Sequence, residues 1–182
     1  MRVTLIAAQS VDGFITRHQT PGTRFTSAAD QAHFARVLRD FDCSVMGATT
    51  YQTVRDTIRR RLEPARRRVV LTHHPERYAA EAIPGALEFT RDEPDALLQR
   101  LAASGHRECA LLGGAQIHRL FLERQRVNRL WLTIEPRLFG TGTPLVGGEI
   151  DRRLRLESVE RLPESDSLLV KYQVEVETSG TG

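Results

Sequence analysis

Residues 108–123 read ECALLGGAQIHRLFLE, and this stretch decides the fold class. After Glu108, residues 109–112 form a short apolar run, as in a strand that is covered on both faces. Two glycines follow, and then Ile117, Leu120 and Phe121 recur at the three- and four-residue spacing of a helix face. The stretch therefore predicts a buried strand that turns directly into a helix.

The same alternation of strand and helix extends in both directions from this stretch. The other predicted strands and helices of this alternating part are Val3–Ala8, a helix that begins at Ser27, Cys43–Met46, Thr49–Ile58, Val69–Leu71, Ala86–Phe89, Pro94–Ala103 and Val127–Ile134. Alternating strands and helices favour an α/β fold with a mainly parallel sheet. At the end of the chain, Leu154–Leu162 and Leu168–Val176 alternate in part and predict an antiparallel hairpin.

Length and composition are those of one ordinary globular domain, with 182 residues, of which 40% are hydrophobic and 27% charged. We expect a single domain over residues 1–177 and a flexible tail over 178–182. No apolar run reaches the roughly 18–20 residues that cross a bilayer. The two cysteines, Cys43 and Cys109, form no C-x-x-C motif, and no His spacing suits a metal. We therefore expect a cytoplasmic protein with no membrane partner, disulfide framework or metal site.

The net charge is +3, and all but one of the 26 basic residues are arginine. Arginines are densest at Arg59–Arg61 and Arg66–Arg68. Such a patch is either a solvated face or attracts an anion, which can be a nucleic acid or a phosphorylated cofactor. The patch contains no aromatic residue for base stacking, so binding of nucleic acid is not expected.

Small or polar residues follow four of the predicted strands, at the point where each strand ends. These residues are Ala7-Ala8, Gly47–Thr50, Thr72–His74 and Gly113–Ala115. In a parallel sheet the carboxyl ends meet at one edge, where ligands bind near helix N-termini. The sequence has neither the G-x-G-x-x-G nor the Walker A motif, so the usual Rossmann and P-loop sites are not predicted.

Six segments, in order, resemble the dihydrofolate reductase superfamily. They are LIAAQSVDGFI, SAADQAHFARVL, VMGATTYQTV, RRRVVLTHH, LLGGAQIHRLFLE and LWLTIEPRLFGTGTP. SVDG and FGTGTPL are most similar to the reductase domain of the bacterial riboflavin-biosynthesis deaminase–reductase and its stand-alone relatives. The resemblance implies a twisted, eight-stranded, mainly parallel sheet with flanking helices, NADPH as cofactor, a small heterocyclic substrate and a homodimer.

The resemblance also implies a cofactor site, carried over by position. Ala8 would present its backbone to the nicotinamide amide. The family's usual arginine after the first glycine is Ala48 here, so Arg67, Arg68 or His73 would offer a cation to the 2′-phosphate. The other implied cofactor residues are Gly47, Ala48, Thr49, Thr50, Leu71, Thr72, His73, Gly113, Gly114, Ala115, Gln116 and Ile117. Glycines allow close backbone approach and a helix N-terminus favours negative charge, which agrees with this placement.

For catalysis the resemblance implies Asp30, with Thr133 as its supporting hydroxyl. Ile6, Asp12 and Phe34 would join Asp30 around the substrate. Asp30 has a second interpretation, because Ser27-x-x-Asp30 has the spacing of a helix capping box. Asp12 before Gly13 is also a common turn former.

The implied activity is that of a 5-amino-6-(5-phosphoribosylamino)uracil reductase, and two departures bear on it. Phe14 stands where riboflavin-type reductases have a lysine, and Pro21 is followed by Gly22 where dihydrofolate reductases have tryptophan. A dihydrofolate or pteridine reductase is therefore the alternative. A basic anion- or nucleic-acid-binding module without catalysis is an alternative of another class, as is a protein that binds NADPH but has lost its chemistry.

Overall fold

The computed structural model describes residues 1–63 and 66–175. The predicted tail over 178–182, and the end of the predicted domain at 177, lie outside the described residues. No helix in the described ranges is long and apolar enough to cross a bilayer.

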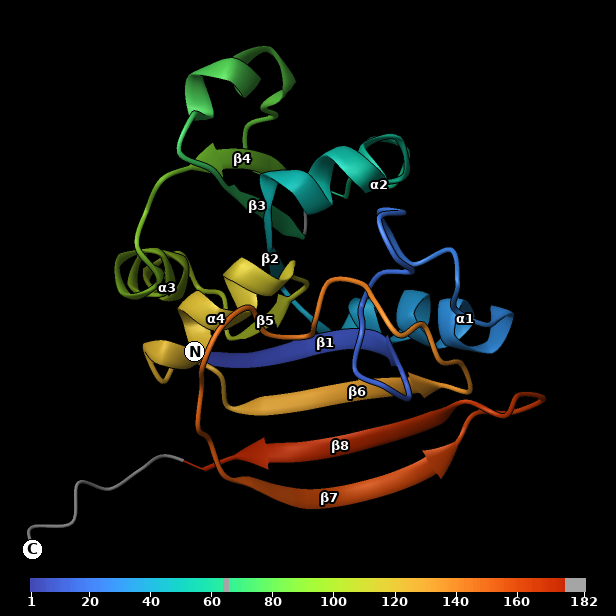
Figure 1. Cartoon of the computed structure of the whole chain (residues 1–182). Helices are drawn as coiled ribbons and strands as arrows, with labels where there is room; N and C mark the ends of the chain where they lie inside the picture. The colour runs from blue at the N-terminus through green and yellow to red at the C-terminus, as the bar shows by residue number, and fades with distance from the viewer. Residues whose placement is uncertain (64–65, 176–182) are drawn as a thin grey trace, which may run out of the picture.

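The described residues form one eight-stranded sheet in the order β4-β3-β2-β5-β1-β6-β8-β7 (Figure 1). The strands are β1 Arg2–Ser10, β2 Cys43–Gly47, β3 Arg67–Leu71, β4 Leu87–Thr90, β5 Glu108–Leu111, β6 Arg129–Glu135, β7 Leu154–Arg161 and β8 Leu168–Val174. Strands β1 to β6 pair in parallel, whereas β8 pairs antiparallel with both β6 and β7. The predicted α/β class, with a mainly parallel sheet and an antiparallel C-terminal hairpin, is confirmed.

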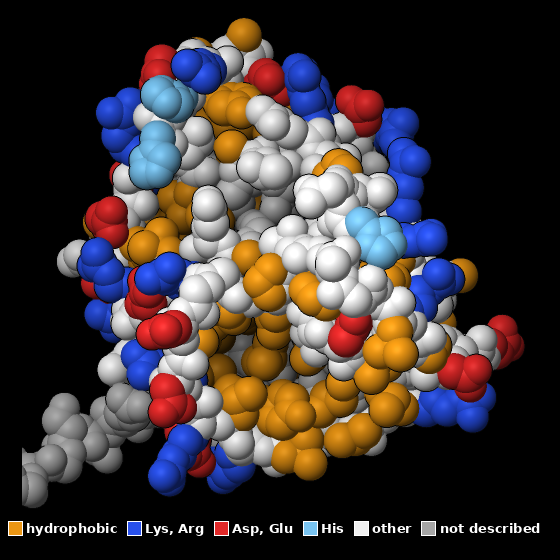
Figure 2. Space-filling view, viewed as in Figure 1, with side chains coloured by type: hydrophobic (Ala, Val, Ile, Leu, Met, Phe, Trp, Pro, Cys, Tyr) orange, Lys and Arg blue, Asp and Glu red, His pale blue; other side chains and the backbone are white. Residues whose placement is uncertain are grey.

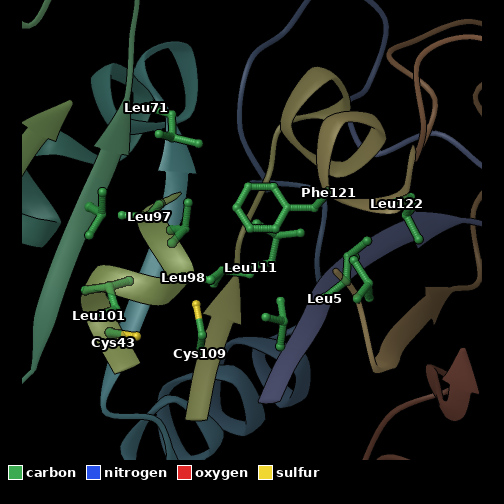
Figure 3. Packing of buried hydrophobic residues seen from close by; sticks show 14 of the residues in the cluster. Leu5, Cys43, Leu71, Leu97, Leu98, Leu101, Cys109, Leu111, Phe121 and Leu122 are labelled. Carbon is green, nitrogen blue, oxygen red and sulfur yellow. The ribbon is translucent and has the colours of Figure 1, made fainter. Parts of the chain in front are cut away.

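Four helices cover the two faces of the sheet. They are α1 Ala28–Val37, α2 Ala48–Arg60, α3 Pro94–Ala103 and α4 Ala115–Glu123, with 3-10 turns at Leu38–Asp40 and Pro75–Glu81. Helices α1 and α2 lie on one face, and α3 and α4 lie on the other. Neighbouring residues of β2 illustrate the division, because Val45 packs with α3 and α4 whereas Met46 packs with α2. Figure 3 shows the α3–α4 side, where leucines of α3 and Phe121 of α4 meet the sheet. Burial on both faces explains the continuous apolar runs.

Element boundaries differ from the sequence prediction where backbone pairing extends into polar residues. Strand β3 begins at Arg67 instead of Val69, since Arg67 and Arg68 pair with Cys43 and Ser44 of β2. The Arg67 guanidinium is ion-paired with Glu88 on β4, which lets a charged residue occupy the strand. Helix α2 likewise continues to Arg60, two residues beyond the predicted end.

The face of the C-terminal hairpin that lies on the α3–α4 side has no helix over it among the described residues. Figure 2 shows hydrophobic side chains gathered over β6, β8 and β7. Leu154, Leu156 and Val159 of β7 are 43%, 56% and 53% exposed, and Leu168 of β8 is 39% exposed. We refer to these four residues as the hairpin patch.

Candidate functional site

A cleft of about 1770 Å³ runs along the carboxyl ends of the strands. We describe its lining as two arms, the first beside β2, β3 and β5 and the second beside β6, because these strands lie on opposite sides of β1. The predicted site residues that line it are Ile6, Ala8, Asp30, Phe34, Gly47, Ala48, Thr49, Thr50, Arg68, Leu71, Thr72, His73, Gly114, Ala115, Gln116, Ile117 and Thr133. Segments far apart in the sequence thus meet at one edge, as the parallel topology requires.

Two helix N-termini point into the first arm. Helix α2 begins after Gly47 and α4 begins after Gly114, and neither glycine provides a side-chain cap. Neither helix has an acidic residue in its first turn, whereas α1 has Asp30 and α3 has Asp95. Uncapped N–H groups and the positive end of the helix dipole favour an anion. This arm therefore suits the phosphates of a dinucleotide.

The two N-termini are held close together by their backbones. The Gly47 N–H donates a hydrogen bond of 2.7 Å to the Gly113 carbonyl oxygen. A Cβ at Gly47 would lie 2.9 Å from Cγ1 of Ile117, and one at Gly114 would lie 3.5 Å from the Thr50 hydroxyl. Glycine at position 47 is therefore required by the close approach of α4 to α2.

The end of β3 lies in the same arm, but the expected cation Arg68 makes a contact elsewhere in the protein. Thr72 and His73 follow the strand and line the cleft. Arg68 lies near the other end of the strand, and its guanidinium donates to the Arg61 carbonyl oxygen at 2.8 Å, at the C-terminus of α2. His73 has no hydrogen-bond or ion-pair partner among the described residues. His73 is thus better placed than Arg68 for a ligand at this end.

Asp30 lies in the second arm, in the first turn of α1, and only 7% of its surface is exposed. Burial raises the pKa of its carboxyl above the ordinary 3.8, and the nearby Glu135 carboxylate adds to the rise. The hydroxyls of Thr133 and Thr26 act in the opposite direction and lower this pKa. The predicted neighbourhood of Asp30 and Thr133 is therefore present. Such a carboxyl can accept hydrogen bonds from a heterocycle or hold a proton for it.

Glu135 is a functional candidate that the sequence analysis missed. It ends β6, is 2% exposed, and forms no ion pair with a described residue. Its Oε1 accepts from the Ser27 N–H at 2.9 Å and its Oε2 accepts from the Ser167 hydroxyl at 2.8 Å. The available signal was an acidic residue at the end of an apolar strand, directly before proline.

Three buried side-chain polar atoms in the described part of the chain have no close hydrogen-bond partner, and all three belong to residues that line this cleft. They are Thr26 Oγ1, Trp131 Nε1 and His118 Nε2. Burial lowers the pKa of His118 to about 4, while its Nδ1 is 2.7 Å from the Leu145 carbonyl oxygen. Since buried polar atoms are normally paired, this concentration favours a ligand-binding role for the cleft.

The structure does not bring Asp12 to the cleft, contrary to the expected substrate role. The Asp12 carboxylate accepts hydrogen bonds from the Ser10 hydroxyl at 2.5 Å and from the N–H groups of Phe139 and Gly140 at 3.0 and 2.7 Å. It therefore fastens the turn after β1 to the loop after β6. The turn-forming interpretation of Asp12 is the one that its contacts support.

Comparisons with known proteins agree with this geometry. The model of the RibD C-terminal domain family matches residues 1–166. A search of curated proteins found no match. A putative riboflavin biosynthesis protein from Shewanella sp. PV-4 has a similar structure, with 22% identity, a TM-score of 0.71, and coverage of 97% of this chain and 100% of that one.

Two further solved structures have the same fold. A pyrimidine reductase-like protein from Corynebacterium diphtheriae is 18% identical, with a TM-score of 0.74 and coverage of 97% and 92% of the two chains. A diaminohydroxyphosphoribosylaminopyrimidine deaminase/5-amino-6-(5-phosphoribosylamino)uracil reductase from Thermotoga maritima is 16% identical, with a TM-score of 0.76. The match covers 96% of this chain but only 56% of the Thermotoga chain.

Proposed function

The chain belongs to the RibD C-terminal domain family, and from this we propose that it is an NADPH-dependent reductase of the riboflavin-biosynthesis type. Its substrate would be a pyrimidine- or pteridine-like heterocycle. One observation carries the proposal: two uncapped helix N-termini and a buried carboxyl, Asp30, line the same cleft. The names of the similar solved structures, which include a deaminase/reductase and a reductase-like protein, support the same reaction class.

The bound nicotinamide would supply the hydride. The N–H groups at the start of α2 and α4 would bind the phosphates, and Ala8 at the end of β1 would lie between the two ligands. In the second arm, Ile6 and Phe34 would pack on the faces of the heterocycle while Asp30 accepts its N–H groups. The protein would thus contribute orientation and a proton-holding group beside the reacting ring.

A pteridine substrate is the second candidate, and two features of the chain favour it. Asp30 with Thr133 provides the carboxylate and hydroxyl that a 2-amino-4-oxo ring would contact. Phe14 offers no cation for a phosphate. Its backbone bridges to Pro144 in a short antiparallel pair.

We also propose a homodimer that forms through the hairpin patch. Four partly exposed aliphatic side chains on adjoining strands are more than isolated surface residues, and a second copy would cover them in a two-fold contact. A cytoplasmic location stays a prediction of the sequence.

Titration of the purified protein with NADPH, and separately with NADH, followed by nicotinamide fluorescence, tests the cofactor. Saturable binding with preference for NADPH is the expected result. A screen of pyrimidine and pteridine substrates by loss of absorbance at the nicotinamide band then tests the reaction. If neither nucleotide binds at high micromolar concentration, the reductase proposal fails and the anion-binding module becomes the leading alternative.

A further inference from the structure

We propose that Glu135 is a positioning residue for Asp30: it occupies the capping place that Asp30 would otherwise fill, and so keeps the Asp30 carboxyl facing the cleft. The effect of Glu135 on turnover rests on the proposed function. The effect of Glu135 on the position and titration of the Asp30 carboxyl does not, and it is measured without any substrate.

The argument begins with a capping box that is only half formed. In a complete box the N-cap serine accepts from the third residue of the helix, whose own side chain accepts from the N-cap N–H. Here the Asp30 N–H donates to the Ser27 hydroxyl at 3.1 Å, which is the first half. The Ser27 N–H, however, donates to Glu135 Oε1 at 2.9 Å. Glu135 thus accepts the second hydrogen bond of the box, so the Asp30 carboxylate is not needed as an acceptor for the Ser27 N–H.

A network of serines fixes the Glu135 carboxylate in this position. The Ser27 hydroxyl is 3.1 Å from Oε1, and the Ser167 hydroxyl donates to Oε2 at 2.8 Å. Ser167 is itself fully buried, and its N–H donates to the Ser165 hydroxyl at 3.0 Å. Donors on both oxygens and the positive end of α1 stabilise the anion where no basic residue is in contact.

The arrangement places two carboxyl groups at one helix N-terminus, which affects the charge of Asp30. The titratable groups that act on Asp30 are Glu135 on β6 and His33 on its own helix. His33 in turn lies within reach of Arg36, Lys171 on β8 and Glu160 on β7. Like charges disfavour ionisation, so Glu135 favours the protonated form of Asp30, and His33 favours the ionised form.

The test is a pH titration of the Asp30 carboxyl carbon by ¹³C NMR in the ligand-free protein, with the resonance assigned by Asp30→Asn. Glu135→Gln keeps an oxygen for the Ser27 N–H but removes the charge. Glu135→Ala removes both and leaves Asp30 free to turn back to Ser27. The matched control is Glu157→Gln on β7, which removes an exposed carboxylate by the same substitution.

We expect the Asp30 midpoint to fall in Glu135→Gln, because a like charge is lost, and to fall further in Glu135→Ala, because the Asp30 carboxylate can then accept from the Ser27 N–H. The control should show no change. Turnover should be largely kept in Glu135→Gln and fall at least about tenfold in Glu135→Ala, with unchanged NADPH affinity. An Asp30 midpoint that is no lower in Glu135→Ala than in Glu135→Gln overturns the proposal. If Glu135→Ala does not fold, Glu135→Gln decides the question: because this variant keeps the cap, a tenfold fall in its turnover overturns the proposal. A protein that reduces no substrate contradicts the proposed function but leaves the titration result valid.

Discussion

The Gly47 N–H donates a hydrogen bond of 2.7 Å to the carbonyl oxygen of Gly113. This single bond joins the end of β2 to the turn that follows β5, at the point where α2 and α4 begin. Because each helix is preceded by a glycine, the two positive helix ends lie close enough to act on one anion.

Gly47→Ala should therefore weaken dinucleotide binding. The new Cβ would lie 2.9 Å from Cγ1 of Ile117, so Ile117 or the start of α4 must move. We expect about tenfold weaker NADPH binding or more, measured by nicotinamide fluorescence. Gly147→Ala is the matched control, since its Cβ would meet only Ala115, at an ordinary 3.8 Å. Equal affinities in the two variants would contradict the role of the Gly47 contact.

Asp30→Asn should separate activity from stability. We expect turnover to fall about a hundredfold or more while NADPH affinity is kept, because the proton-holding carboxyl is lost. The pKa of Asp30 is raised above 3.8 in the folded protein, so its ionisation at higher pH costs stability. The variant should therefore melt at a higher temperature than the wild type at pH 8. The two proteins should converge below pH 3.8, where the carboxyl is protonated in both states; a lower melting temperature at pH 8 would contradict this.

His118 should make the folded state sensitive to acid. Its pKa is about 4 when folded, against an ordinary 6.5, so the unfolded chain takes up a proton between these values. Stability from this group is complete above about pH 6.5 and is lost as the pH falls to about 4, by about 3 kcal/mol. Urea unfolding of His118→Asn across this range should show a shallower loss of stability than the wild type. Equal slopes in the two proteins would count against a buried neutral imidazole.

Leu156→Lys should turn a dimer into a monomer. Leu156 is 56% exposed in the hairpin patch, and a buried lysine there would have no partner across a two-fold contact. Sedimentation velocity should show the wild type at twice the mass of the variant. Arg155→Glu alters the opposite face of the same strand and should remain dimeric. A monomeric wild type would refute the proposed dimer directly.

Local sequence patterns predicted the fold well, because each depends on a few neighbouring residues. The helix Pro94–Ala103 was predicted with the bounds that the structure has, since Pro94 marks its first turn and Gly105 follows its end. The strand β3 was predicted too short, because Arg67 enters the sheet only through its pairing with β2 and Glu88. A partner on another strand is invisible in a local pattern.

The candidate site was predicted by resemblance more than by pattern, and its gaps have a physical reason. Ser27-x-x-Asp30 correctly predicts that Ser27 caps α1. The sequence spacing also predicts that Asp30 completes the box, whereas Glu135, 108 residues from Ser27, takes that place. Asp12 and Glu135 are both acidic residues, one just after the end of an apolar strand and the other at the end of one. Only the tertiary structure shows that one holds a loop and the other lies beside Asp30.

The strand order has one more consequence. Strands β2, β3 and β5, on one side of β1, carry the arm with the helix N-termini, whereas β6 on the other side carries Thr133 and Glu135. The dinucleotide and the heterocyclic substrate would therefore be bound by separate parts of the sheet that share only β1. A new substrate preference could be evolved in the laboratory by randomising residues of α1 and β6 alone, without changing the residues that bind the nucleotide.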